Sequence, residues 1–278
     1  MGRRLSPCVA IALAVAWVLL PVAAGAQVEF TVIGWNAESG DAHPDTVAAL
    51  IRDTQGCDIW GMCEVQDAAW GDAFTAAAGH GENAQFAYVL GTTGSADRMA
   101  IIYNADRFTL AHSMELHRIN VTGRARAPLV ARFRINGTNT EFLFMINHLY
   151  RTRPEPRHVQ ARLLNRWAAE QTLPIIAVGD YNFDWEVHCG DINHDRGYDE
   201  MVSGGFFNWV RPRQLMKTQA SPDYNSVLDF VFLGGDSWAW EAESTILARG
   251  ARDSGGETLS DDEHVSDHRP VRATITIE

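Results

Sequence analysis

Polar side chains that can bind a metal ion or move a proton follow or interrupt several apolar segments of this 278-residue sequence. They are Asn36, Glu64, His148, Asp180, Asn182, Asp229, Asp267 and His268. Because open α/β sheets bind their ligands at the carboxyl ends of strands, we expect these side chains to converge. Taken singly, each has a plainer explanation, since an asparagine often shapes a turn and a histidine often sits in a core. Convergence is therefore what would make them a site.

Attack of water on a phosphodiester is the chemistry that uses such a set of groups. It needs a hard cation on oxygen ligands, and Glu64, Asn36 and Asp267 offer oxygens of that kind. It also needs a group that orients and deprotonates water, for which the carboxylate of Asp180 is suited.

Two histidines and an acid supply the remaining groups. His148 and His268 can donate hydrogen bonds to phosphoryl oxygens or hand a proton to the leaving oxygen. Asp229 lies in the middle of an apolar segment, where a carboxylate needs a partner. An imidazolium at His268 would be that partner.

Signatures of other chemistries are absent from the sequence. It contains no CxxC or HExxH pattern for zinc, no glycine-rich phosphate loop for a nucleotide and no GxSxG elbow for a serine nucleophile. The residues favour metal-assisted hydrolysis over these alternatives.

The predicted elements alternate between strands and helices early and late, with a run of strands between. Helices are predicted at 41–54, 67–79 and 154–170, and strands at 28–35, 57–65, 85–90, 99–103, 106–117, 128–135, 140–147, 173–180, 227–232 and the C-terminus. This order favours mixed sheets that pack face to face under covering helices. The aromatic segments 206–210 and 238–240 are interpreted as core packing rather than membrane wedges.

Six short motifs occur along the chain in a characteristic order. They are GWN, CEV, NHL, GDYN, LDF and SDHRP. In that order and spacing they resemble the endonuclease/exonuclease/phosphatase superfamily over residues 29–277. The resemblance implies a four-layer αββα sandwich of two mixed, mainly antiparallel sheets flanked by helices. It also implies a Mg²⁺-dependent phosphoesterase in which Mn²⁺ can substitute.

The resemblance assigns a role to each motif residue. It implies that Glu64, Asn36 and Asp267 hold the metal. It also implies that Asp180 activates water, with Asn182 placing the water or the phosphate. By the same resemblance His148 and His268 contact the phosphoryl group, and Asp229 orients His268. Arg126 falls where deoxyribonuclease-like members place an arginine that contacts substrate phosphate. Asp97 is expected to support His148.

The N-terminus predicts export. Residues 1–26 begin with a basic MGRR, continue as an apolar stretch broken by Pro21 and end in small residues, as a cleaved signal peptide does. A membrane anchor is the alternative, but the apolar stretch is barely long enough. We expect a mature chain of residues 27–278 that forms one catalytic domain and is secreted to the periplasm or outside the cell.

The mature chain is strongly acidic. Loss of Arg3 and Arg4 leaves 21 basic against 35 acidic side chains, a net charge of −14. This charge argues against a broad surface that coats nucleic acid, although a bound divalent metal can reverse the sign inside one cleft.

A secreted nuclease acting on DNA or RNA is the leading interpretation, followed by an enzyme acting on a phospholipid or another small phosphodiester. An inactive binding protein is a further alternative. No stable protein partner is implied, and we expect a monomer.

Two further features concern cysteines and calcium. Cys57 and Cys63 lie in one predicted strand, about 20 Å apart, too far for a disulfide, whereas Cys189 could pair with either. Residues Asp191, Asn193 and Asp195 alternate as calcium ligands do, but the following glycine and glutamate positions do not match. A structural Ca²⁺ there is the alternative to helix capping.

Overall fold

The computed structural model describes residues 2, 27–123, 125–220, 223–247 and 265–277. The predicted signal peptide therefore lies outside the described residues except for Gly2, and so does residue 278. Within the described part of the chain, no helix has both the length and the apolar character needed to cross a membrane.

The chain alternates strands with four α-helices and two short 3₁₀ helices over its described residues. In order these are β1 (Val28–Asn36), α1 (Pro44–Asp53), β2 (Ile59–Val65), α2 (Ala68–Glu82), β3 (Phe86–Leu90), β4 (Arg98–Asn104), β5 (Phe108–Glu115), η1 (His117–Ile119), β6 (Leu129–Ile135), β7 (Glu141–His148), α3 (Pro154–Ala169), β8 (Pro174–Glu186), α4 (Arg196–Val202), η2 (Ser203–Gly205), β9 (Phe207–Trp209), β10 (Ser226–Gly235), β11 (Trp240–Ile246) and β12 (Val271–Ile277).

The strands form two six-stranded sheets. Their orders are β11-β12-β1-β2-β4-β3 and β5-β6-β7-β8-β10-β9. Each sheet holds one parallel pair near its centre, β1 with β2 and β7 with β8, and its other pairings are antiparallel. The sheets are mixed and mainly antiparallel, as predicted.

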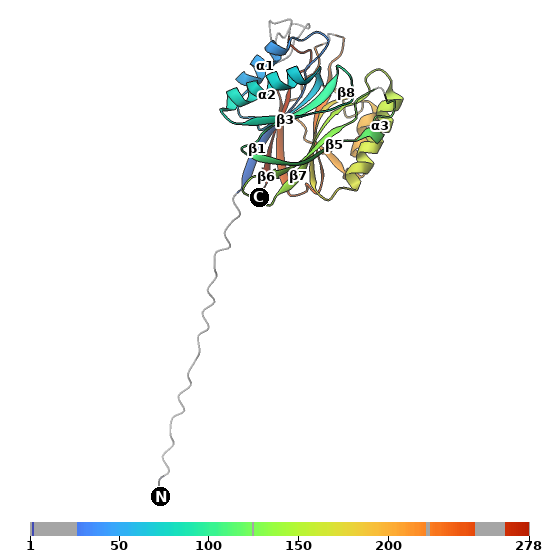
Figure 1. The fold of residues 1–278 in the computed structure, drawn as a ribbon. Helices are drawn as coiled ribbons and strands as arrows, with labels where there is room; N and C mark the ends of the chain where they lie inside the picture. The colour runs from blue at the N-terminus through green and yellow to red at the C-terminus, as the bar shows by residue number, and fades with distance from the viewer. Residues whose placement is uncertain (1, 3–26, 124, 221–222, 248–264, 278) are drawn as a thin grey trace.

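Helices cover the outer faces of the two sheets. In Figure 1, α1 and α2 lie over the sheet that contains β3 and β1, and α3 lies on the opposite side of the molecule. Val47 of α1 and Phe74 of α2 belong to one apolar cluster with Trp35 and Trp60 of the first sheet. The helix–sheet–sheet–helix order confirms the predicted four-layer sandwich.

Aromatic side chains fill the space between the sheets. Phe30 of the first sheet stacks on Phe142 of the second, with ring centroids 5.3 Å apart, and Trp240 packs edge-on against both rings. The packing interpretation of the segment 238–240 holds for Trp240, whereas Trp238 is 86% exposed. In the segment 206–210, Phe207 is buried and Phe206 is 43% exposed.

Two glycines let the sheets approach closely beneath the strand ends. A Cβ added at Gly34 would lie 2.9 Å from Cβ of Val178, and one added at Gly61 would lie 2.5 Å from Cγ2 of the same valine. Only a residue without a side chain fits at such positions. The central strands β1 and β2 are therefore pressed against β8, and their carboxyl ends meet.

The structure corrects the predicted course of several segments. The strand predicted to end at residue 180 continues as β8 to Glu186, and β9, α4 and β11 were not predicted. The continuation includes Asn182 and Asp184 at positive φ, so β8 is irregular where the polar residues lie. The burial of β11 alternates, but its inward positions include Ser244 and the small Ala242, so the apolar alternation that would predict a strand is weak.

Residues 191–195 form a capped turn. The Asp195 carboxylate accepts a hydrogen bond from the Gly197 N–H at the start of α4 and pairs with Arg157 and His158. Asp191 pairs with Arg211. The capping interpretation is thus supported, and cationic side chains already neutralise two of the three proposed calcium ligands.

The cysteines of the described residues are free thiols. Cys57 and Cys63 are buried, and Cys189 is exposed. The Cys63 thiol donates to the Asn147 carbonyl oxygen at 3.2 Å, which links β2 of one sheet to β7 of the other. Cys63 therefore contributes to the contact between the sheets as a buried polar group.

We predict that Gly61→Ala will destabilise the protein by about 2 kcal/mol, because the new methyl group would overlap Val178. Val178→Ala should also cost about 2 kcal/mol through the cavity that it creates. The double variant should lose less stability than the sum of the two single losses, because each change relieves the strain or fills the cavity that the other creates. Urea denaturation of the three variants measures this coupling, and strictly additive losses would show that the two sheets do not meet at this contact.

Candidate active site

The predicted side chains converge at the carboxyl ends of the two parallel strand pairs. Asn36 ends β1, Glu64 lies near the end of β2, His148 ends β7, and Asp180 lies beside it on β8. A cavity of about 240 Å³ opens there. It is lined by Glu38, Gly40, Asp41, Glu64, His148, Arg151, Asp180, Asn182, Gln219, Leu228, Asp267 and His268. Six of the eight predicted residues line it, and Asn36 and Asp229 lie buried behind them.

Asn36 connects the two sheets at the floor of the cavity. Its Nδ2 donates to Glu64 Oε1 at 3.0 Å and to Asp180 Oδ2 at 3.2 Å. Its Oδ1 accepts the Glu38 N–H at 3.0 Å. The amide therefore holds two carboxylates from different sheets next to each other, in addition to the ligand role that the sequence suggests.

Asp180 is the buried carboxylate at the centre of the site. Burial raises its pKa to about 7, and the charges of Asp229 and Glu64 also raise it, while His268 and the Asn36 hydrogen bond act in the opposite direction. Its Oδ1 accepts the Asn182 N–H at 3.0 Å, and the Asn182 side chain donates to the Leu149 carbonyl oxygen. A carboxylate with this pKa can accept a proton from water near neutral pH.

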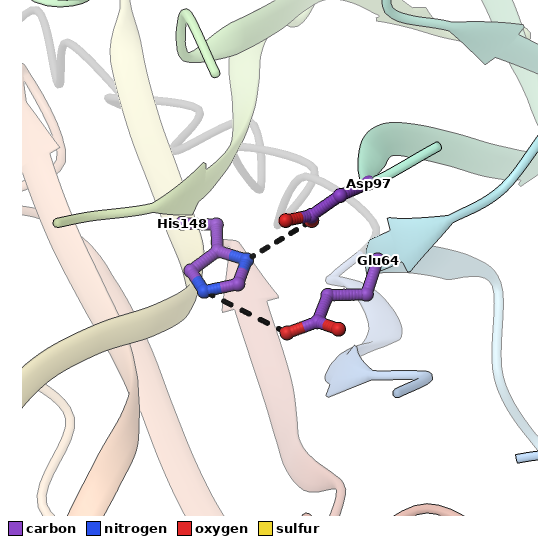
Figure 2. Close-up of side chains that lie close together, drawn as sticks. All are labelled: Glu64, Asp97 and His148. Atoms are coloured by element: carbon purple, nitrogen blue, oxygen red, sulfur yellow. Dashed lines mark ion pairs between the residues drawn. The ribbon is translucent and has the colours of Figure 1, made fainter. Parts of the chain in front are cut away.

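His148 lies between acidic groups of both sheets. Its Nε2 is 3.4 Å from Asp180 Oδ2 and 3.9 Å from Glu64 Oε1, and its Nδ1 is 3.7 Å from Asp97 Oδ1. Figure 2 shows the imidazole between Asp97 and Glu64. Burial lowers its pKa well below 6.5, and the charges of Arg126, His268 and Arg151 lower it further. His148 is therefore neutral at neutral pH.

Arg126 and Asp97, which the sequence singles out only through the family resemblance, lie together behind His148. The Arg126 guanidinium forms an ion pair with the Asp97 carboxylate and is largely buried. Asp97 Oδ1 and His148 Nδ1 have no hydrogen-bond partner among the described residues, although they face each other at 3.7 Å. The structure thus brings Arg126, Asp97 and His148 into one row, in which Arg126 contacts Asp97.

His268 forms a buried pair with Asp229. Its Nδ1 lies 2.8 Å from Asp229 Oδ2. Burial alone would lower the pKa of His268, but the charge and hydrogen bond of Asp229, with the charges of Asp180 and Asp267, raise it well above 6.5. His268 is therefore an imidazolium at neutral pH, and its Nε2 faces Asp180 and Asp267 at 3.9 and 3.8 Å.

Thr218 sets the position of Asp229. The strand β10 has an irregularity between Val227 and Asp229, and the Thr218 hydroxyl oxygen accepts the N–H groups of Leu228 and Asp229 there. The hydroxyl satisfies two backbone donors that the irregular pairing leaves without a strand partner. No local sequence pattern predicted a role for this buried threonine.

Glu38 positions the loop that carries Asp267 and His268. Its carboxylate accepts the Asp267 N–H at 2.7 Å, and Ser266 and His268 bond to Asn36 and Trp35 of β1. Glu38 has a positive φ of 51° and was not among the predicted residues. Its place two residues after Asn36, in a short polar turn, was the available signal.

The residues present fit a hard divalent cation. Five carboxylates line the cavity, from Glu38, Asp41, Glu64, Asp180 and Asp267. The cationic side chains that line it are Arg151 and His268, so the lining carries an excess of negative charge. Oxygen donors in excess over cations are the environment that Mg²⁺ and similar ions occupy. Within the described chain, Glu64, Asp97 and His148 form one group with ligand atoms close together, and Asp180, Asp229 and His268 form another.

Residues 33–268 match the endonuclease/exonuclease/phosphatase family over most of the chain. The chain belongs to this family. Enzymes of the endonuclease/exonuclease/phosphatase family hydrolyse phosphate esters, and the site geometry agrees with that class of reaction. No curated protein sequence gave a significant match.

Solved structures show the same fold at low sequence identity. A Bacteroides thetaiotaomicron endonuclease/exonuclease/phosphatase family protein superposes with a TM-score of 0.67 at 18% identity, covering 91% of this chain and 99% of that one. The D. rerio TDP2 structure complexed with single-strand DNA product gives 0.68 at 14% identity, covering 89% and 98%. The B. thetaiotaomicron mannosyl-6-phosphatase Bt3783 gives 0.62 at 19% identity, covering 88% and 99%.

We predict that Asp229→Asn will lower the pKa of His268, because the charge that outweighs the burial of the imidazole is removed. NMR titration of the histidine Cε1–H signals in the metal-free protein measures this value. The pKa of His148, which burial depresses, should stay low and serves as the internal control. A His268 pKa that stays well above 6.5 in the variant would show that Asp229 is not the group that keeps the imidazole charged.

Proposed function

We propose that the protein is an exported, Mg²⁺-dependent phosphodiesterase that hydrolyses nucleic acid by metal-assisted attack of water. The observation that carries the proposal is the environment of Asp180. This carboxylate, with a pKa of about 7, lies within 4 Å of a neutral and a cationic imidazole and next to Glu64. A base, an acid and a metal-side carboxylate are thus assembled around one space that a phosphate group can enter.

The side chains divide the reaction between them. The substrate phosphate enters the cavity, where Asp180 accepts the proton of the attacking water and Asn182 helps to place the water or the phosphate. His268 donates from Nε2, because its Nδ1 is committed to Asp229, and its charge stabilises the phosphoryl oxygens. Neutral His148 contacts the phosphoryl group through Nε2, with Asp97 and Arg126 behind it.

In this proposal Glu64, Asn36 and Asp267 hold the metal, and Mn²⁺ can replace Mg²⁺. A divalent cation bound there supplies Lewis-acid stabilisation of the charge that develops on the phosphate. It also offsets the negative charge of the cavity, which would otherwise repel a phosphodiester.

Nucleic acid is favoured over phospholipid by the placement of Trp238 and Phe206, the exposed tryptophan and phenylalanine of the described residues. The strand β10 ends at Gly235, and Trp238 follows it. Gly235 lies six residues beyond Asp229, a separation of about 20 Å along a strand. Phe206 also lies at this end, since a Cβ at Gly234 would touch its carbonyl oxygen. These side chains are too far from the cavity to press a membrane against it. The likeness to a TDP2 complex with single-strand DNA product supports the same choice at the level of the fold.

Export and a monomeric state belong to the same proposal. They rest on the N-terminal 26 residues and on the absence of any sequence feature that implies a stable partner. A small phosphodiester is the second candidate substrate. The remote alternative is that the protein is an inactive binding protein of the same fold.

We predict that the protein without residues 1–26 will nick supercoiled plasmid in the presence of Mg²⁺ and not in excess chelator. Asp180→Asn and His268→Ala should each reduce nicking by at least about a hundredfold, because each removes a proton-transfer group. Circular dichroism provides the check on folding. If metal-loaded, folded protein leaves plasmid intact but hydrolyses a phospholipid diester, phospholipid would replace nucleic acid as the proposed substrate.

We predict that Glu64→Gln will raise the Mg²⁺ concentration needed for half-maximal activity about tenfold or more, because a charged oxygen ligand is lost. Asp267→Asn should act in the same direction. Calorimetric titration with Mg²⁺ gives the binding constant independently of turnover. Glu241→Gln, an exposed glutamate on β11, is the matched control that should leave Mg²⁺ binding unchanged. Equal Mg²⁺ affinity in the Glu64 variant and the control would count against the ligand role.

A further inference from the structure

A second cavity of about 340 Å³ continues from the active site. It is lined by Arg151, Thr152, Arg157, Asn182, Asp184, Gln219, Tyr224 and Leu228. Four of these residues, Arg151, Asn182, Gln219 and Leu228, also line the cavity around Asp180. The two spaces therefore share a wall, and a substrate whose phosphate lies at Asp180 extends into the second one. Its volume falls in the range of small-molecule sites.

The shared wall is built from well-anchored segments. The buried Arg157 donates from Nη1 to the carbonyl oxygens of Tyr150 and Arg151, both at 2.9 Å, and its Nη2 pairs with Asp195 at 2.6 Å. The backbone that carries Arg151 is fixed by these contacts. On the other side, Gln219 lies in a β-bridge with His268, and the Ala220 N–H donates to the Asp267 carbonyl oxygen at 2.7 Å. A wall held on both sides is formed before any ligand arrives.

The chemistry of the lining selects among the possible ester groups. Only Tyr224 and Leu228 present mainly apolar side chains, which is too little apolar surface for the acyl chains of a lipid. Asn182, Gln219 and Asp184 offer amide and carboxylate groups that can pair with the N–H and C=O edges of a ring. Tyr224 is 59% exposed at this cavity and offers an aromatic face.

The charge of the lining argues in the same direction. The Arg151 guanidinium has no hydrogen bond or ion pair to another described residue, and it stands between the two cavities. It attracts the phosphate and repels a quaternary ammonium such as choline. The exposed Asp184 carboxylate also lines the second cavity and disfavours a second bare phosphate there. A neutral ring with polar edges fits this combination.

We propose that the second cavity binds a nucleoside esterified to the scissile phosphate, with its base stacked on Tyr224 and its polar edge facing Asn182, Asp184 and Gln219. This inference rests on the proposed phosphodiesterase function and names the group next to the phosphate. Stacking of a base on an aromatic side chain tolerates different bases, so the site selects nucleosides without demanding a sequence.

Calorimetric titration of the Mg²⁺-loaded protein with four probes tests the proposal. The probes are inorganic phosphate, thymidine 5′-monophosphate, thymidine 3′-monophosphate and phosphocholine. At least one of the nucleotides should bind about tenfold more tightly than inorganic phosphate, because the base adds a stacking contact. Tyr224→Ala should remove about tenfold of that nucleotide's affinity. The affinity for inorganic phosphate, measured on the same variant, reports whether its phosphate site is intact.

Two control variants separate stacking from other effects. Tyr224→Trp keeps an aromatic face and should retain the preference for the nucleotide. Trp238→Ala removes an exposed aromatic ring at the far end of β10 and should leave all four affinities unchanged. Either a preference that survives Tyr224→Ala or a phosphocholine affinity above that of both nucleotides would overturn the proposal, as would nucleotides that bind no better than phosphate.

Failure of the subsite and failure of the proposed function give different results. Hydrolysis of bis(p-nitrophenyl) phosphate with Mg²⁺ checks the phosphodiesterase function without a nucleoside. Release of inorganic phosphate from the thymidine monophosphates would indicate a phosphatase, which contradicts the proposed function but leaves the nucleoside preference measurable. A diesterase without nucleotide preference would overturn only the subsite.

Discussion

The site depends on the close approach of the two sheets at Gly34 and Gly61. Neither position has room for a Cβ, because Val178 of the facing sheet occupies the space. With larger residues there, the sheets would have to separate, and the hydrogen bond from Asn36 to Asp180, which crosses from one sheet to the other, would lengthen beyond its 3.2 Å. The absence of two methyl groups in the core thus allows one amide to hold carboxylates of both sheets.

Each sheet contributes to the site through its parallel pair of strands. Parallel neighbours bring two carboxyl ends to the same edge, which places Asn36 near Glu64 in one sheet and His148 beside Asp180 in the other. The antiparallel pairings around them do not have this property, because neighbouring strands end on opposite edges. Two such pairs packed face to face give four functional side chains from strands far apart in the sequence.

Much of this arrangement could be predicted from the sequence, because its determinants are local. Apolar runs that end in Asn36, His148 or Asp180 mark both a strand and the edge at which it ends. The motif order identified the family and with it the four-layer fold. Asp229 was predictable for a physical reason, since a carboxylate between Leu228 and Phe230 requires a buried partner.

The remainder depends on contacts between segments that no local pattern encodes. Thr218 acts by accepting N–H groups ten and eleven residues away, and Glu38 by accepting one 229 residues away. Arg151 and Gln219 are ordinary polar residues in the sequence, and only the tertiary fold places them on a wall shared by two cavities. The course of β8 beyond Asp180 was missed because left-handed residues such as Asn182 usually indicate a turn, whereas here they bend a strand that continues.

Both histidines are buried, yet His148 is neutral and His268 is an imidazolium. Desolvation disfavours both imidazolium ions, and for His148 nearby cations act in the same direction. His268 differs because Asp229 lies 2.8 Å from its Nδ1, on the side away from the cavity. The negative charge of Asp229 stabilises the imidazolium that burial alone would disfavour. Because Asp229 occupies Nδ1, the only proton that His268 can offer toward the cavity is on Nε2. One carboxylate behind the site therefore decides both the charge of the acid and the direction in which it donates.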